Sequence, residues 1–148
     1  MVYGLTSLKA SLWAAESPSG DKITNSSSYI RLNRILSTNE ITVEASGIDV
    51  TAVEDDTTHY AAGRAEVGET YTIEFLATNE TIAEWETLKG KKICFLEKIE
   101  GLNKQCFIIA TVPNAIPKAP IENGAAYSAS ISCTINNYIG YDTAVAGL

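Results

Sequence analysis

One histidine occurs in the 148-residue chain, and it limits the acid–base and nucleophilic chemistry that the protein could perform. His59 lies in a long polar stretch, next to Tyr60 and a few residues after Asp55 and Asp56. A Ser/His/Asp or Cys/His site would need this imidazole as its base, oriented by a carboxylate and placed beside a nucleophile. A solvated loop residue is the simpler interpretation. We therefore predict no catalytic residue and no enzyme activity.

The cysteines and the densest acidic run lack the spacing of a metal or redox site. Cys94, Cys106 and Cys133 are odd in number, form no C-x-x-C motif and sit in apolar segments, so we expect buried thiols. The run Glu54–Asp56 lacks the D-x-[DN]-x-[DN]-G rhythm of a calcium loop. We accordingly predict no metal and no cofactor.

The charge of the chain is acidic and unevenly distributed. Eighteen Asp and Glu against eleven Lys and Arg give a net charge of −7, which disfavours binding to nucleic acid. Twelve acids and a single base, Arg64, lie between Glu40 and Glu86, whereas the following stretch to Lys118 is basic. A molecule with one acidic and one basic zone can associate head-to-tail with its own copies. The alternative is that these charges only keep a monomer soluble.

Most of the chain shows the alternation typical of β-strands, so strands must position the residues named above. We predict strands over residues 29–36, 41–54, 71–75, 93–98, 105–112 and 127–136, from their alternation of apolar and polar side chains. Gly47 shifts the apolar set from odd to even positions, which indicates a β-bulge or a kink. Residues 93–98 and 105–112 form a hairpin, and residues 112–124, with three prolines, form an extended connection.

One helix is predicted, over Glu80–Lys89, with Asn79 or Thr78 as its N-cap and Gly90 at its end. Ile82, Trp85 and Leu88 recur every three residues and form the stripe that packs on the sheet. The fold class is mainly β: a single domain over residues 1–148, a β-sandwich or partly open barrel of about six or seven strands with one short helix on its outside. No signal peptide and no apolar run long enough for a membrane anchor is expected.

The order of these segments resembles the major tail tube proteins of long, flexible-tailed bacteriophages, the siphophage tail tube family. The resemblance rests on the interrupted strand that ends in Ile48–Thr51, the acidic stretch Glu54–Arg64, the strand Tyr71–Phe75 and the short helix after it, and it covers residues 28–141. It implies a structural protein of the virion tail, made in the host cytoplasm. Six copies would join their sheets into a ring-shaped β-barrel, and the rings would stack into a tube through which the genome leaves.

The resemblance also assigns roles to segments. The long loop 55–68, including Asp55, Asp56, His59, Tyr60 and Arg64, would reach the neighbouring ring. The N-terminal arm and first strand (1–28) and the C-terminal tail (138–148) would add further inter-ring contacts. The implied partners are the protein itself, the tape measure, tail terminator and distal tail proteins, and passing double-stranded DNA without specific binding.

The polar faces of strands should line the lumen of such a tube. The residues concerned are Thr42, Glu44, Thr72 and Glu74, together with Ser130, Ser132 and Thr134. Carboxylates and hydroxyls do not bind phosphate tightly, so DNA could slide past them.

Two other functions remain open at this point. The chain could be a tube subunit of a contractile or secretion-type injection device, which would differ mainly in its partners. It could also be a small ligand-binding β-sandwich, which would need an exposed aromatic cluster that Trp13 and Trp85 are too far apart in sequence to suggest.

Overall fold

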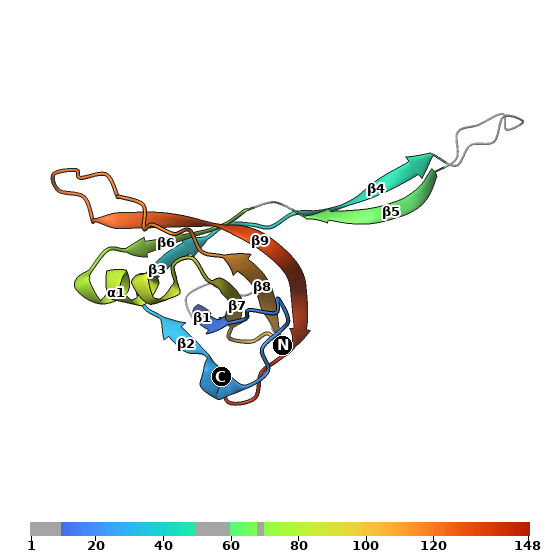
Figure 1. The fold of residues 1–148 in the computed structure, drawn as a ribbon, viewed down its shortest axis with the longest axis horizontal. Coiled ribbons are helices and arrows are strands. Elements are labelled where there is room, and N and C mark those ends of the chain that lie inside the picture. The colour runs from blue at the N-terminus through green and yellow to red at the C-terminus, as the bar shows by residue number, and fades with distance from the viewer. Residues whose placement is uncertain (1–9, 50–59, 68–69) are drawn as a thin grey trace, which may run out of the picture.

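The fold is mainly β with a single α-helix. The computed structural model describes residues 10–49, 60–67 and 70–148, and of residues 44–49 and 60–67 it describes the backbone. Seven strands form one antiparallel sheet in the order β2-β1-β7-β8-β9-β6-β3, and β4 with β5 forms a separate two-stranded ribbon (Figure 1). The elements are β1 (Ala10–Glu16), the 3₁₀ turn η2 (Ser26–Ser28), β2 (Ile30–Leu32), β3 (Ile35–Thr38), β4 (Val43–Asp49), β5 (Tyr60–Val67), β6 (Thr70–Leu76), α1 (Asn79–Leu88), β7 (Lys92–Ile99), β8 (Lys104–Thr111) and β9 (Ser128–Thr143).

The sheet curls until its two edges nearly meet. Its edge strands, β2 and β3, are consecutive in the chain, so Leu32 and Ile35 lie at most about 10 Å apart. The single strand predicted over residues 29–36 is therefore wrong in one respect: β2 pairs with β1, whereas β3 pairs with β6. Arg34, with φ of 54°, makes the corner between them. The result is a partly open barrel, not a closed one.

Strand β9 joins the two halves of this sheet. Its first part, from Ser128 to Thr134, pairs with β6, and the rest, from Thr134 to Thr143, pairs with β8. Two register shifts in the β8 pairing bend the strand as it passes from one half to the other. The predicted strand over 127–136 was thus too short, and residues 138–143, predicted as part of a tail, belong to β9.

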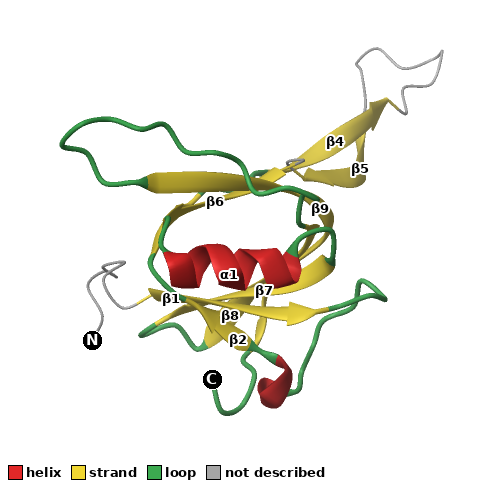
Figure 2. Cartoon of the chain, turned by 60° about the vertical axis from the view of Figure 1, so that its left-hand side comes forward, coloured by secondary structure: helices red, strands yellow, loops and turns green. Residues whose placement is uncertain are grey.

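Helix α1 lies within the curl of the sheet (Figure 2). Thr78 is its N-cap, as predicted, and it forms a capping box with Thr81. Trp85 and Leu88 are buried in the core and Ile82 is half-buried, so the predicted stripe does pack on the sheet. The main core combines these residues with the inward-facing side chains of β6, β7, β8 and β9.

A second apolar cluster covers the opposite face of β1, β7 and β8. Phe107, Ile109 and Leu96 belong to it, as do Tyr29, directly before β2, and Val145, close to the C-terminus. The 17–29 segment and the C-terminal residues are held there by hydrogen bonds and by a cation–π contact. The described parts of the predicted arm and tail therefore pack on their own subunit; residues 1–9 lie outside the described residues.

Of the β4–β5 ribbon, β4 falls within the strand predicted over residues 41–54, whereas β5 falls where a long loop was predicted. The register shifts between Ala45 and Gly47, which confirms the bulge predicted at Gly47. Residues 60–67 form β5, so the predicted loop over residues 55–68 is wrong for this part. Residues 55–59 and 68 lie outside the described residues. The hairpin of β7 and β8, the strand β6 and the extended connection after β8 agree with the predictions.

Candidate assembly site

A polar, almost uncharged surface covers one face of β6 and the first part of β9. In the pairing of these strands Thr72 lies opposite Ser132 and Glu74 opposite Ser130. The hydroxyl oxygens of Thr72 and Ser132 are 3.1 Å apart and share a hydrogen bond. The intervening residues, such as Ile73 and Ile131, are buried in the core on the other face. The alternation of side chains along β6 and β9 thus places apolar residues in the core and polar residues on the opposite face.

The same surface continues onto β3. The Ser37 hydroxyl donates to a carboxylate oxygen of Glu74 at 3.4 Å, and these two residues are register partners. We call this surface the hydroxyl face; its residues are Ser37, Thr72, Glu74, Ser130, Ser132 and Thr134. Glu74 is its one ionisable side chain. Short hydroxyls offer weak, exchangeable hydrogen bonds and no cation for a phosphate, so the face can touch a polyanion without holding it.

The structure brings two of the four predicted lumen residues together. Thr72 and Glu74 lie on the hydroxyl face, as do the three hydroxyl residues predicted on β9. Thr42 precedes β4, and Glu44 lies in β4 of the separate ribbon, so neither shares this sheet. Sequence analysis missed Ser37, because residues 35–38 were assigned to a strand ending at Leu36.

The ribbon is the second candidate surface. It projects away from the body of the molecule, and among the described strands β4 and β5 pair only with each other (Figure 1). Glu44 and Glu66 are register partners in it. Of the predicted inter-ring residues, Tyr60 and Arg64 lie in β5, whereas Asp55, Asp56 and His59 are outside the described residues.

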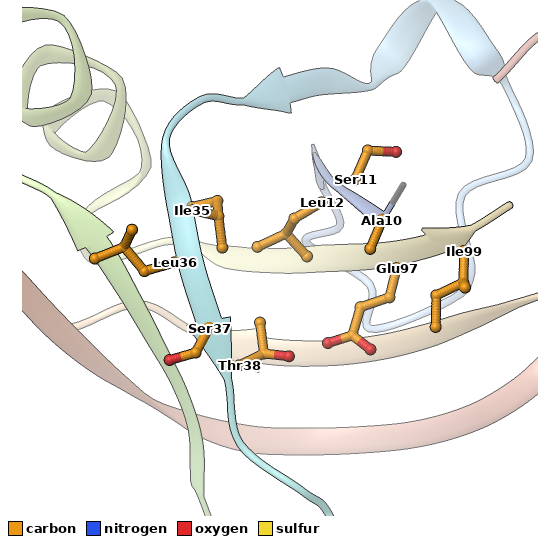
Figure 3. A pocket seen from close by; sticks show the side chains of 9 residues that line it. All are labelled: Ala10, Ser11, Leu12, Ile35, Leu36, Ser37, Thr38, Glu97 and Ile99. Atoms are coloured by element: carbon orange, nitrogen blue, oxygen red, sulfur yellow. The ribbon is translucent and has the colours of Figure 1, made fainter. Parts of the chain in front are cut away.

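A pocket of about 380 Å³ opens where the curled sheet fails to close (Figure 3). β1 and β3 form its two walls, and Glu97 and Ile99 of β7 contribute to its lining. The Glu97 carboxylate accepts a hydrogen bond from the hydroxyl of Tyr71. Burial, and then the neighbouring Glu97, raises the pKa of Tyr71 well above its usual value. The described lining holds no histidine, cysteine or aromatic ring, and Glu97 is its one ionisable side chain.

The buried thiols are unsuited to catalysis. All three cysteines are free and buried. Burial raises the pKa of Cys133 to about 12 and that of Cys106 to about 11, so both stay protonated at neutral pH. Within residues 10–49, 60–67 and 70–148 there is no group of three or more candidate metal ligands. No helix in the same residues is long and apolar enough to cross a membrane.

Two solved structures of similar fold come from tail and baseplate particles. Neither a protein-family model nor a curated protein matches the sequence, whereas twelve chains of solved structures match the fold. One belongs to the tail of an empty GTA particle with C6 symmetry; it has a TM-score of 0.52 and 14% identity, over 90% of this chain and 95% of that one. Another belongs to the 6-fold symmetrised baseplate of the anti-feeding prophage, with a TM-score of 0.52 and 12% identity over 100% of both chains. The chain therefore shares the fold of these tail and baseplate components.

Proposed function

We propose that this protein is a structural subunit of a phage-type tail tube. Six copies form a ring, the rings stack into a hollow tube, and the genome passes through the lumen. The fold shared with tail and baseplate particles of six-fold symmetry supports this proposal. The protein would act in the virion tail without catalysis.

The observation that carries the proposal is the hydroxyl face. An ordinary solvent-exposed sheet face carries many charged side chains, because Lys and Glu keep a surface soluble. Here the paired positions of β6 and β9 present Thr, Ser and one Glu, and no cation lies among them. Such a face suits contact with a moving polyanion, since each added Lys or Arg would add a salt-dependent contact that retards it.

The ribbon supports the stacking part of the proposal. A two-stranded hairpin is marginally stable in water without a third strand or a packing partner. The β4–β5 ribbon has no such partner among the described strands of its own chain. A contact with a copy in the next ring would supply one, and the ends of a completed stack would be taken by terminator and distal tail proteins, with a tape measure protein inside.

A tube or baseplate subunit of a contractile device is the second candidate, favoured by the anti-feeding prophage chain that this chain matches along its whole length. The two candidates differ in what surrounds the tube. Images of native particles with a sheath around the tube would favour the contractile device, and bare tails would favour the flexible-tailed phage.

Thiol labelling in assembled tubes tests which face lines the lumen. All three native cysteines are buried, so a single cysteine introduced at the surface reports its own accessibility. We would place one on the hydroxyl face, Ser132→Cys, and a matched one on the exposed side of α1, Ala83→Cys. In tubes, Ser132→Cys should react with a small maleimide and be protected from a large polymer-linked one, whereas Ala83→Cys reacts with both. Equal reaction of both variants with the large reagent would remove the hydroxyl face from the lumen.

A further inference from the structure

We infer that the loop 120–127 of one copy docks into an apolar groove at the far end of β9 of a second copy. This loop is the last part of the connection between β8 and β9, and the groove lies beside the turn between β7 and β8. The inference rests on the proposed tube, and it adds a head-to-tail contact through which the copies associate.

The loop 120–127 is exposed along its whole length and is mainly apolar. All eight of its residues are exposed, and five of them are Pro, Ile, Ala or Tyr. Ile121 is 77% exposed, more than any other large apolar residue in the described part of the chain. The Ala125 N–H donates to the Glu122 carbonyl oxygen at 3.3 Å, which closes a turn at the tip. The loop therefore presents an apolar projection at the start of β9 (Figure 1).

An open groove of about 570 Å³ lies at the other end of β9. Ile99, Leu102 and Tyr141 supply its apolar surface, and Asn103 and Lys104 complete the lining. Leu102 is 39% exposed and Tyr141 is 60% exposed, so the groove can receive a further side chain. Ile99 also lines the pocket at which the curled sheet fails to close, so the two hollows adjoin (Figure 3).

Most of the exposed large apolar residues in the described part of the chain belong to these two places. The seven residues are Ile30, Leu36, Val43, Leu102, Ile121, Tyr127 and Tyr141. Two of them lie on the loop, two line the groove, and Leu36 lines the adjoining pocket. Exposed apolar side chains that gather in a few places mark contact sites.

The register of β9 separates the loop from the groove. The loop joins β9 at Ser128, which pairs with Leu76, whereas Tyr141 pairs with Cys106 near the β7–β8 turn. The distance from Ser128 to Tyr141 measured along the strand is about 40 Å. Among the described residues, none from the loop lines the groove of its own subunit. An apolar projection and an apolar groove at opposite ends of one molecule fit a heterologous contact between copies, which repeats around a ring or along a stack.

Charge complementarity favours this loop as the occupant of the groove. Glu122 directly follows Ile121, and the exposed Lys104 lines the groove two residues after Leu102. The neighbouring acid Asp142 is already ion-paired with Lys22, at 3.5 Å. With Ile121 in the groove, Glu122 would face Lys104 at its edge. Such a pair contributes mainly to the register and specificity of a contact whose strength comes from apolar burial.

Cross-linking of two introduced cysteines tests the contact directly. The variant Ile121→Cys with Leu102→Cys carries one cysteine on each surface, and the three native cysteines are buried. In the assembled full-length protein, a short bis-maleimide should join copies into a ladder of dimers and higher oligomers on a denaturing gel. The matched control, Ile121→Cys with Ser19→Cys, moves the second cysteine to an exposed site beside the start of β7 and should stay monomeric.

Substitutions test how much the contact contributes to assembly. Ile121→Asp should raise the protein concentration needed for tubes at least about tenfold, because burial of an isoleucine side chain changes an equilibrium constant by that factor or more. Lys104→Glu should raise it by a smaller factor, and adding Glu122→Lys should restore the wild-type value. The control Glu86→Lys makes the same charge change on the exposed side of α1 and should assemble as the wild type does.

Each outcome supports or overturns the inference. The absence of a ladder, as when another segment fills the groove, would overturn it, and so would an equal ladder in the Ser19→Cys control. Tubes from Ile121→Asp at the wild-type concentration would also overturn it while leaving the proposed tube intact. If the wild-type protein forms neither rings nor tubes, the proposed function fails and this contact fails with it. Thermal unfolding of each variant separates a lost contact from a lost fold.

Discussion

Replacing Trp85 by phenylalanine should leave the protein as stable as the wild type or more stable. Trp85 is completely buried on α1, and its ring centroid lies 5.5 Å from that of Phe75 and 6.2 Å from that of Phe95. Its indole N–H is the one buried side-chain polar atom in the described residues that has no hydrogen-bond partner. The substitution removes this donor and keeps an aromatic ring against both neighbours.

The size of the change in the free energy of unfolding follows from two opposing contributions. A buried donor without a partner costs about 1–3 kcal/mol, and removing it recovers that amount. Phenylalanine is smaller than tryptophan by about 35 Å³, and a void of that size costs roughly 1 kcal/mol at about 24 cal/mol per Å³. The expected net change in the free energy of unfolding is between zero and about 2 kcal/mol of added stability. Trp85→Ala, which also removes the stacking ring, should instead lose about 3–5 kcal/mol.

Urea unfolding followed by far-UV circular dichroism measures these differences, because tryptophan fluorescence itself changes with the substitution. The contrast between Trp85→Phe and Trp85→Ala carries the reasoning, since both remove the same N–H. If Trp85→Phe loses as much stability as Trp85→Ala, the indole N–H must have a partner, such as an ordered water, and the argument from an unsatisfied donor is refuted.

Three further predictions concern the cap, the buried thiol and the hydroxyl face. Thr78→Ala removes the capping box of α1 and should cost about 1 kcal/mol in thermal or urea unfolding, whereas Thr87→Ala on the exposed side of the helix should cost less. Burial raises the pKa of Cys133 from 9.0 to about 12, so the native state keeps a proton that the unfolded state loses. The free energy of unfolding should then fall as the pH rises above about 9, and Cys133→Ala should fall less steeply; identical slopes would contradict this. Glu74→Lys should leave tubes assembling, because the Glu74 side chain accepts only a long hydrogen bond from Ser37 among the described residues, but should slow genome passage; particles of normal infectivity would count against a lumen position.

The sequence predicted the elements whose signals are local. The cap at Thr78 and the three-residue spacing of Trp85 and Leu88 define the helix whatever surrounds it. The alternation along β6 and the start of β9 identified both the core face and the hydroxyl face. The shift of apolar positions at Gly47 located a bulge, because an extra residue in a strand changes the phase of its pattern.

The failures have topological causes. The strand predicted over residues 29–36 is divided at Asn33 and Arg34 because its halves pair with opposite edges of a curled sheet, which no local pattern encodes. The end of β9 was predicted too early because bulges in its pairing with β8 break the alternation on which the prediction rested. β5 was missed because Ala61, Gly63 and Ala65 are so small that its alternation of apolar and polar residues is weak; its pairing with β4 shows that it is a strand.

Cryo-electron microscopy of the purified, full-length protein tests the central claim most directly. The account predicts rings of six copies that stack into hollow tubes, with the hydroxyl face of β6 and β9 turned toward the lumen and α1 turned away from it. Particles that stay monomeric under every assembly condition, or tubes whose lumen is lined by α1, would contradict it.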